Sequence, residues 1–431
     1  MLKVCKFGGS SLADAKQFAK VKAIIESDEA RKVIIVSAPG KSQAEPEKVT
    51  DLLIRAYKTK DIKKVKERII SIKKDLGLSC NVEDPLDAIE KALAQDIITE
   101  PALVSRGEYF SALLLADYLG YTFLDSRNLI HFQENGRVDL EKTRNDIAYA
   151  VAKAEKVVIP GFYGTNPDGS IGLLSRGGSD VTAAYVADAV AADLYENFTD
   201  VSGFYMADPR LVENPRRIKE ISYDELRELS YSGAQVLHEA TIIPLLEKGI
   251  PLELLNTNNP EEGSTLIKKD AREGHHLVTG FTGRKGFMAL TFVKTLTSDK
   301  LDVIRKILNV LYEHKIPVEH IPTSIDSFSV IVDKKKAEEQ LGSLISDFEA
   351  IPEIVSITQD DDIALVAIVG QNMAKKPGSS GRLLSIFGEE KINIKLIDQG
   401  RVEINIIVGI SNDDFEKSIQ ALYSRFAREL L

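Results

Sequence analysis

Residues 2–11 read LKVCKFGGSS, a β-rich run over residues 2–7 followed by a turn of glycine and serine, with a helix expected from about Asp14. Four further β-rich runs come before residue 260, over residues 31–37, 156–160, 194–198 and 250–255. Helical patterns separate these runs, so the sequence predicts an α/β fold with a mainly parallel sheet that helices cover on both faces. Ligands of such sheets bind at the carboxyl ends of the strands, which makes the turns after the strands the first candidates for a site.

Composition limits the class of protein. Of the 431 residues, 44% are hydrophobic and 28% are charged, which is typical of a globular chain and excludes a disordered or collagen-like one. The 65 acidic residues outnumber the 55 basic ones, and the net charge of −10 argues against nucleic acid or an anionic membrane as the main partner. Two cysteines exclude a disulfide framework, and no zinc motif is present. Because no apolar run approaches the ~20 residues of a membrane span, and no signal peptide is evident, we expect a soluble cytoplasmic protein.

The last third of the chain contains two similar patterns, each in the order β-α-β-β-α, after a polar stretch that is typical of a linker. A sixth element, a strand, follows the first pattern but not the second. We therefore hypothesise that residues 276–283 supply the strand that the second pattern lacks. The expected divisions are a first domain, a linker with the lent strand, and two modules, over residues 1–265, 266–285, 286–360 and 361–431.

The segment KTKDIKKVKERIISIKKDLG, residues 58–77, is highly charged and has apolar residues at helical spacing. Mixed charges of this kind are typical of a solvated helix face. The sequence predicts a helical excursion from the sheet rather than a nucleic-acid site.

Two of the turns at the predicted binding edge have phosphate- or substrate-binding character. Gly8, Gly9 and Ser10 follow Lys6, and such a turn lets backbone N–H groups approach phosphate oxygens next to a cation. It lacks the P-loop pattern, and a purely structural turn is the alternative. Ser37 opens the turn SAPG after the second strand, for which an ordinary turn is the alternative. Thr50 follows at the start of the next helix, where it is either a site residue or a helix N-cap.

Three further segments carry charged candidates. Glu108 begins an apolar helix and either caps it or receives a substrate ammonium group. The long glycine-rich loop over residues 161–180 contains Arg176, whose planar fork suits a carboxylate or phosphate, and ends at Asp180, for which an N-cap is the alternative. In the loop over residues 199–210, Tyr205 and Arg210 are candidates for a purine ring and phosphates, unless this is an ordinary surface loop.

Taken in order along the chain, these motifs resemble aspartate kinases of the amino acid kinase superfamily. The resemblance covers residues 2–267 closely, and the tail more loosely resembles the paired ACT regulatory modules of the same enzymes. It rests on KFGGSS, VSAPG, SRGE, LSRGGSDVTAA, FTDVSGFYMADPR, SGAQVLHEAT and LLNTNNPEEGSTLI. The resemblance implies a three-layer α/β/α kinase fold with two βαββαβ, ferredoxin-like ACT modules. It also implies transfer of the γ-phosphoryl group of ATP, with Mg²⁺, to the β-carboxylate of L-aspartate.

The same resemblance implies roles for individual residues. Catalysis is assigned to Lys6 and Asp180, and the aspartate pocket to Ser37, Thr50, Glu108 and Arg176. Nucleotide binding is assigned to Lys6, Gly8, Gly9, Ser10, Thr199, Asp200, Tyr205 and Arg210. Gln235 stands where relatives have a lysine, so one cationic contact to ATP is missing and a higher KM for ATP is expected.

Regulation is expected in the tail. The segment PVEHIPTS, residues 317–324, resembles the effector strand of lysine-sensitive enzymes, so L-lysine is expected to bind near Val318, Glu319 and Ser324. A tail used only for dimerisation is the alternative, and a homodimer or dimer of dimers through the ACT modules is expected. Two other functions stay open at this point: a kinase for glutamate or a nucleoside monophosphate, and an amino-acid sensor that has lost catalysis.

Overall fold

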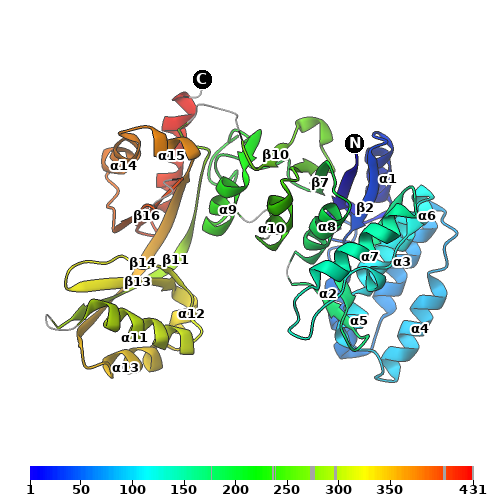
Figure 1. Ribbon diagram of the computed structural model, residues 1–431, viewed down its shortest axis with the longest axis horizontal. Helices are drawn as coiled ribbons and strands as arrows, with labels where there is room; N and C mark the ends of the chain where they lie inside the picture. The colour runs from blue at the N-terminus through cyan, green and yellow to red at the C-terminus, as the bar shows by residue number, and fades with distance from the viewer. Residues whose placement is uncertain are drawn as a thin grey trace. The chain divides into compact units, whose positions relative to one another are not determined.

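The structure is a computed structural model that describes residues 1–175, 177–234, 237, 239–271, 277–295, 299–400 and 404–429. The chain divides into two compact units (Figure 1). The first comprises Met1–Phe204, Lys219–Asp224 and Val236–Glu273, and the second comprises Tyr205–Ile218, Glu225–Gln235 and Gly274–Leu431. The segments Tyr205–Ile218 and Glu225–Gln235 lie before residue 265 in the chain and group with the second unit.

The first unit is built on an eight-stranded sheet with the strand order β3-β4-β2-β1-β7-β9-β10-β8. Neighbouring strands are parallel except for β9 and β10, which are antiparallel. The strands are β1 (Lys3–Phe7), β2 (Arg31–Val36), β3 (Thr122–Phe123), β4 (Val157–Pro160), β7 (Leu194–Thr199), β8 (Glu220–Ser222), β9 (Leu252–Asn256) and β10 (Thr265–Lys268), with a separate hairpin of β5 (Tyr163–Thr165) and β6 (Ile171–Leu173). The mainly parallel sheet is the predicted one.

Helices cover both faces of this sheet. Strand β1 shows this arrangement, because its side chains point alternately toward the helices on one face and toward those on the other. Cys5 and Phe7 face a core shared with α1, α2, α3, α4 and α6, whereas Lys6 faces α8. The helices are α1 (Ala15–Glu26), α2 (Val49–Thr59), α3 (Lys63–Leu76), α4 (Glu83–Ala94), α5 (Glu100–Val104), α6 (Arg106–Leu119), α7 (Leu140–Ala152), α8 (Gly178–Ala189) and α10 (Glu239–Lys248), with 3-10 turns η1 (Gly9–Leu12), η2 (Ser126–Asn128) and η3 (Pro260–Glu262). The three-layer α/β/α prediction is confirmed.

Most of the charged segment over residues 58–77 forms the predicted helix, α3 (Lys63–Leu76), and its first two residues end α2. Its Val65, Ile69 and Ile72 pack into the core of the first unit. The prediction of a solvated charged face fails at Arg68, whose side chain is 3% exposed. Sequence spacing alone did not separate this arginine from the exposed lysines around it.

The second unit is built on a six-stranded antiparallel sheet with the order β12-β13-β11-β14-β16-β15. Its strands are β11 (Gly280–Lys294), β12 (Val318–His320), β13 (Ser327–Asp333), β14 (Ile354–Val369), β15 (Leu396–Asp398) and β16 (Asn405–Ile410). Its helices are α9 (Tyr223–Ser232, which begins in the first unit), α11 (Lys300–Glu313), α12 (Lys334–Glu338), α13 (Leu341–Glu349), α14 (Ser379–Glu389) and α15 (Phe415–Glu429), with the 3-10 turn η4 (Gln371–Lys375).

Two long strands, β11 and β14, are shared by both ACT-like patterns. Residues 287–293 of β11 pair with β13, and residues 280–284 pair with the part of β14 that also pairs with β16. The segment before residue 285 thus joins the sheet beside the second pattern, as a lent strand would. The sequence presented these strands as separate runs because bulges interrupt their alternation between Arg284 and Ala289.

The sheet of the second unit is strongly curved. Strands β12 and β15 occupy opposite edges in the strand order, yet Nδ1 of His320 lies 2.7 Å from Oδ2 of Asp398. The concave face that results encloses a small apolar cluster that includes Phe287, Leu365 and Ile407. Helices pack against the other face in two separate cores. In the described part of the chain, no helix has both the length and the apolar character needed to cross a membrane.

Candidate active site

Lys6 lies near the carboxyl end of β1, in the middle of the first sheet. Its Nζ is 2.7 Å from Oδ1 of Asp180 in the first turn of α8. Nδ2 of Asn197, which is paired in register with Lys6 on β7, donates to the same oxygen at 2.9 Å. One carboxylate oxygen therefore holds both an ammonium and an amide group, and the lysine side chain, 9% exposed, is fixed in orientation.

The Asp180 side chain does not cap its helix. Gly177 occupies the N-cap position of α8 with a φ of 79°, in the left-handed region where glycine is favoured. The N-cap alternative for Asp180 is therefore wrong, and its carboxylate is available to Lys6.

The turns after β1 and β2 are in direct backbone contact. The N–H of Gly40 donates to the carbonyl oxygen of Gly9 at 2.7 Å, and a Cβ added to Gly40 would lie 2.4 Å from the Gly9 carbonyl carbon. The N–H of Gly8 donates to the carbonyl oxygen of Phe198, and Gly8 lies beside Lys6 Nζ. Glycine at these positions thus lets two loops close on each other next to a buried cation, with Ser10 in the 3-10 turn that follows.

Ser37 and Thr50 follow β2 at the same edge of the sheet. The backbone N–H of Ser37 donates to the Phe7 carbonyl oxygen at 3.1 Å, which continues the parallel pairing beyond the strand. Thr50 lies in the first turn of α2, whose N-cap is Lys48. The N-cap alternative for Thr50 is therefore wrong.

Glu108 is a buried carboxyl group in the first turn of α6, 5% exposed. Burial raises its pKa to about 8, against the opposing effects of the backbone N–H groups of Glu108 and Ala38 and of the nearby Arg106. Among the described residues, its Oε2 has no hydrogen-bond partner. A buried carboxyl oxygen without a donor is expected to attract a cationic ligand, because that ligand would supply the missing partner.

The predicted nucleotide residues fall into two groups. Thr199 ends β7 and donates from Oγ1 to Oδ1 of Asp200 at 3.1 Å, at the same sheet edge as Lys6. Tyr205 and Arg210 belong to the second unit, where the exposed Arg210 pairs with Asp208 at 2.6 Å. The structure therefore places the first pair with the Lys6 region, and the role of the second pair stays a prediction.

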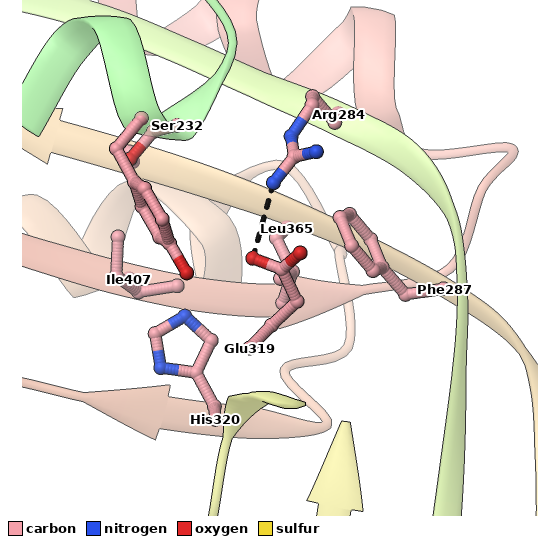
Figure 2. Close-up of a pocket in the computed structure, with 9 residues that line it drawn as sticks. Ser232, Arg284, Phe287, Glu319, His320, Leu365 and Ile407 are labelled. Carbon is pink, nitrogen blue, oxygen red and sulfur yellow. Dashed lines mark hydrogen bonds and ion pairs between the residues drawn. The ribbon is translucent and has the colours of Figure 1, made fainter. Parts of the chain in front are cut away.

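The predicted effector residues take three different environments. Val318 packs against the core of the first module, Ser324 is exposed, and Glu319 lines an open pocket on the concave side of the second sheet. In this pocket the guanidinium of Arg284 faces the Glu319 carboxylate (Figure 2), with Nη2 and Oε2 3.1 Å apart. Glu319 is only 12% exposed and already has an internal cation as its partner.

Comparison with known proteins connects these features to a family. The model of the amino acid kinase family matches residues 1–256, and an ACT domain model matches residues 366–426. Aspartokinase 3 of Bacillus subtilis is 34% identical over 99% of this chain and 98% of its own length. The chain belongs to the aspartokinase family.

Solved aspartokinase structures agree with this assignment. The crystal structure of Clostridium acetobutylicum aspartate kinase superposes with a TM-score of 0.91 at 40% identity, covering 99% of each chain. E. coli aspartokinase III, solved with aspartate and ADP, gives a TM-score of 0.78 at 26% identity over 98% of this chain and 99% of that one. The same E. coli enzyme solved with lysine and aspartate gives 0.77 at 25% over 99% of each. The predicted family, fold and enzyme class, a phosphotransferase with a carboxyl acceptor, are confirmed.

Two residues that matter to the aspartokinase prediction, Arg176 and Gln235, lie outside the described residues. The expected carboxylate contact of Arg176, and the expected effect of Gln235 on ATP binding, therefore stay predictions. Conversely, sequence reasoning missed Asn197. Its signal was a pair of adjacent polar residues, Glu196 and Asn197, inside a strand that the fold buries on both faces.

Proposed function

We propose that this chain phosphorylates the β-carboxylate of L-aspartate with ATP, giving 4-phospho-L-aspartate and ADP, the first step toward lysine, threonine and methionine. The observation that carries the proposal is the Lys6–Asp180–Asn197 arrangement beside the glycine turn after β1. This arrangement fixes an ammonium group at the place where the γ-phosphate of ATP and the β-carboxylate of aspartate, both anions, would have to approach each other.

The chemistry asks little of the protein beyond position and charge. The acceptor carboxylate is already ionised at pH 7, so it needs no general base. Phosphoryl transfer depends mainly on alignment and on neutralising the charge of the transferring group. Lys6 Nζ would donate to that group, while Asp180 and Asn197 hold the ammonium in place.

Substrate roles follow from the family and from the site. Glu108 would receive the α-ammonium of aspartate, Arg176 its carboxylate, and Ser37 and Thr50 would complete the pocket. The nucleotide would be bound by the backbone of the glycine turn and by the polar residues after β7 and beyond, namely Gly8, Gly9, Ser10, Thr199, Asp200, Tyr205 and Arg210. The catalytic domain would extend over residues 1–265, with a lent strand within 266–285 and ACT modules over 286–360 and 361–431.

We also propose that Mg²⁺ accompanies ATP. The described residues contain no group of three His, Cys, Asp or Glu side chains able to hold a metal. This fits an ion bound largely by phosphate oxygens and water, with one or two carboxylates at most. Asp180 is the carboxylate that would meet it, and the ion would supply further neutralisation of phosphate charge.

L-Lysine is the proposed effector, and the ACT modules are the proposed site of homodimer or dimer-of-dimers formation. In support, the E. coli relative has been solved with lysine, and Glu319 offers a nearly buried carboxylate in the second unit. Feedback would require two conformations that lysine binds unequally. A cytoplasmic location stays a prediction.

An aspartate hydroxamate assay tests the proposal. Purified protein would be incubated with ATP, Mg²⁺ and hydroxylamine, with aspartate compared against glutamate. A nucleoside monophosphate, whose phosphorylation forms no hydroxamate, would be tested in parallel by the release of ADP. Hydroxamate formed from aspartate alone is the expected result, and lysine, but not an equal concentration of alanine, should reduce it. Product with glutamate but not aspartate, or no product with any acceptor, would overturn the proposed activity.

A further inference from the structure

Arg68 is a charged side chain in the core of the first unit that the proposed chemistry does not use. It projects from α3, is 3% exposed, and is surrounded by the apolar side chains that bury this helix. Burying a guanidinium costs free energy unless each of its donors has a partner. Among the described residues, neither its Nε nor its Nη1 has a hydrogen-bond partner, although Nη1 lies within ion-pair distance of Glu45. An apolar side chain would suit the helix–core contact better, so the contacts that Arg68 makes call for another explanation.

Those contacts are to the backbone of the two turns of the candidate site. Nη2 of Arg68 donates to the carbonyl oxygen of Gly40 at 2.9 Å and to that of Ala13 at 2.5 Å. Gly40 ends the turn after β2, and Ala13 closes the 3-10 turn that follows the glycine turn after β1. Nη2 of Arg68 therefore links the two loops through one hydrogen bond to each.

The two loops also contact each other directly. The Gly40 N–H donates to the Gly9 carbonyl oxygen at 2.7 Å, with no room for a side chain between them. Arg68 Nη1 makes a further ion pair with Glu45 at 2.7 Å, which ties down the segment leading from Gly40 to α2. Beyond the Ser37–Phe7 hydrogen bond that continues the strand pairing, the two loops are thus held together by the Gly40–Gly9 hydrogen bond and by the buried guanidinium.

We propose that Arg68 is a positioning residue that sets the distance between the loop that binds the phosphoryl donor and the loop that binds the acceptor. This inference rests on the proposed function, because it takes Gly8–Ser10 as the ATP side and Ser37 as the aspartate side. Small errors in the approach of two reactants reduce the rate steeply, while each reactant still binds its own loop. Loss of Arg68 should therefore lower kcat far more than it raises either KM.

Steady-state kinetics of Arg68→Lys and Arg68→Ala test the proposal, with Lys66→Gln as a control on the exposed side of the same helix, where Lys66 pairs with Asp87 and Glu90. Arg68→Ala should lose about tenfold to a hundredfold in kcat, with each KM changed less than about threefold. Millimolar guanidinium chloride should restore part of that kcat, and methylammonium chloride should not. The kcat of Arg68→Lys should lie between those of the wild type and Arg68→Ala, since the lysine ammonium is a point donor without the planar fork of a guanidinium.

The outcomes separate the possible failures. Unchanged kcat in a folded Arg68→Ala protein would overturn the inference, and so would a kcat loss that guanidinium leaves unaltered. If neither variant folds, as judged by thermal unfolding, Arg68 is a stability residue and the inference is wrong. Absence of aspartate-dependent turnover in the wild-type protein would instead refute the proposed function.

Discussion

Each unit contains an ion pair at a predicted ligand site, but the two pairs are built differently. Lys6–Asp180 in the first unit is nearly buried and has Asn197 as a third partner on the same oxygen. Arg284–Glu319 in the second unit lines an open pocket, with Arg284 35% exposed (Figure 2). An anionic ligand can add to the first pair without breaking it, because the lysine has further donors. A cationic ligand of Glu319 has to compete with Arg284.

An ion pair at a ligand site can therefore have either of two effects: it can hold a charged group ready for a ligand, as Asp180 holds Lys6, or it can occupy the position that a ligand would take, as Arg284 does at Glu319. A fixed pair oriented by a neutral third group is preorganised for charge that appears during reaction. A pair such as Arg284–Glu319, whose arginine is partly open to solvent, is weaker and more readily exchanged, since solvent screens the arginine. Four substitutions test the comparison, in order of decreasing expected effect.

Lys6→Ala should lower kcat by about a thousandfold, because it removes the cation that would meet the transferring phosphoryl group. It also leaves Asp180 without its ammonium partner, so the melting temperature should fall as well. Turnover in the hydroxamate assay and a thermal unfolding curve measure the two effects. Lys16→Ala, at an exposed position of α1, serves as the control. A Lys6→Ala protein that keeps a tenth of its turnover would show that the pair is structural and that another group neutralises the charge of the transferring phosphoryl group.

Glu108→Gln should raise the KM for aspartate about tenfold to a hundredfold, since a charge-assisted hydrogen bond to the substrate ammonium is lost. Because the pKa of Glu108 is raised to about 8, the empty wild-type site is largely protonated at neutral pH. Its kcat/KM for aspartate should therefore rise with pH up to about 8, and this rise should be absent in the variant. Initial rates across this pH range give the answer, with Glu141→Gln as an exposed control.

The raised pKa of Glu108 also predicts how stability depends on pH: kcat/KM should rise with pH, whereas stability should fall. Its pKa is higher in the folded protein than the usual 4.5, so the folded state holds a proton that the unfolded state releases. The free energy of unfolding should then decrease as pH rises from about 4.5 to about 8. Glutamine does not titrate, so the melting temperature of Glu108→Gln should exceed that of the wild type by a margin that widens over this range. A constant margin would contradict the raised pKa.

Asn197→Leu should lower kcat about tenfold, because the hydrogen bond from Nδ2 to the ionised Asp180 is worth ~1.5–3 kcal/mol and orients the carboxylate that holds Lys6. The KM values should change little, since Asn197 is not expected to touch either substrate. Asn258→Ala, at an exposed position beyond β9, is the matched control. Equal loss in kcat and in both affinities would mean that Asn197 only supports the fold.

Arg284→Gln should lower the lysine concentration for half-inhibition about twofold to fivefold, because the internal competitor for Glu319 is removed. An ion pair whose arginine is partly exposed is worth only ~0.2–1 kcal/mol. Arg305→Gln, which breaks an exposed pair with Asp302 on α11, should leave this concentration unchanged. Inhibition curves with lysine measure it directly. Weaker inhibition in Arg284→Gln would reverse the comparison, because the arginine would then assist the effector rather than displace it.

Much of the candidate site was predictable because it rests on local chemistry. Gly8 and Gly9 after a strand, next to Lys6, indicate an anion-binding turn without knowledge of the remaining fold. Asp180 was also predicted, although by its motif rather than by its partner. Asn197 and Arg68 were not, because a polar side chain in a strand and an arginine in a charged helix have the same spacing whether they are buried or exposed.

The amino-acid sequence alone was enough to predict the alternation of strands and helices, the parallel sheet with its loops at one edge, and the residue types in those loops, since these follow from periodicity and turn chemistry. Only the tertiary structure shows which residues contact each other. Lys6 and Asn197 both contact Oδ1 of Asp180, and Arg68 donates to the backbone of Gly40 and Ala13. Arg284 pairs with Glu319. The tertiary structure also joined separate runs into the shared strands β11 and β14. The physical reason is that burial and pairing depend on strands and helices far apart in the chain, whose packing no local pattern records.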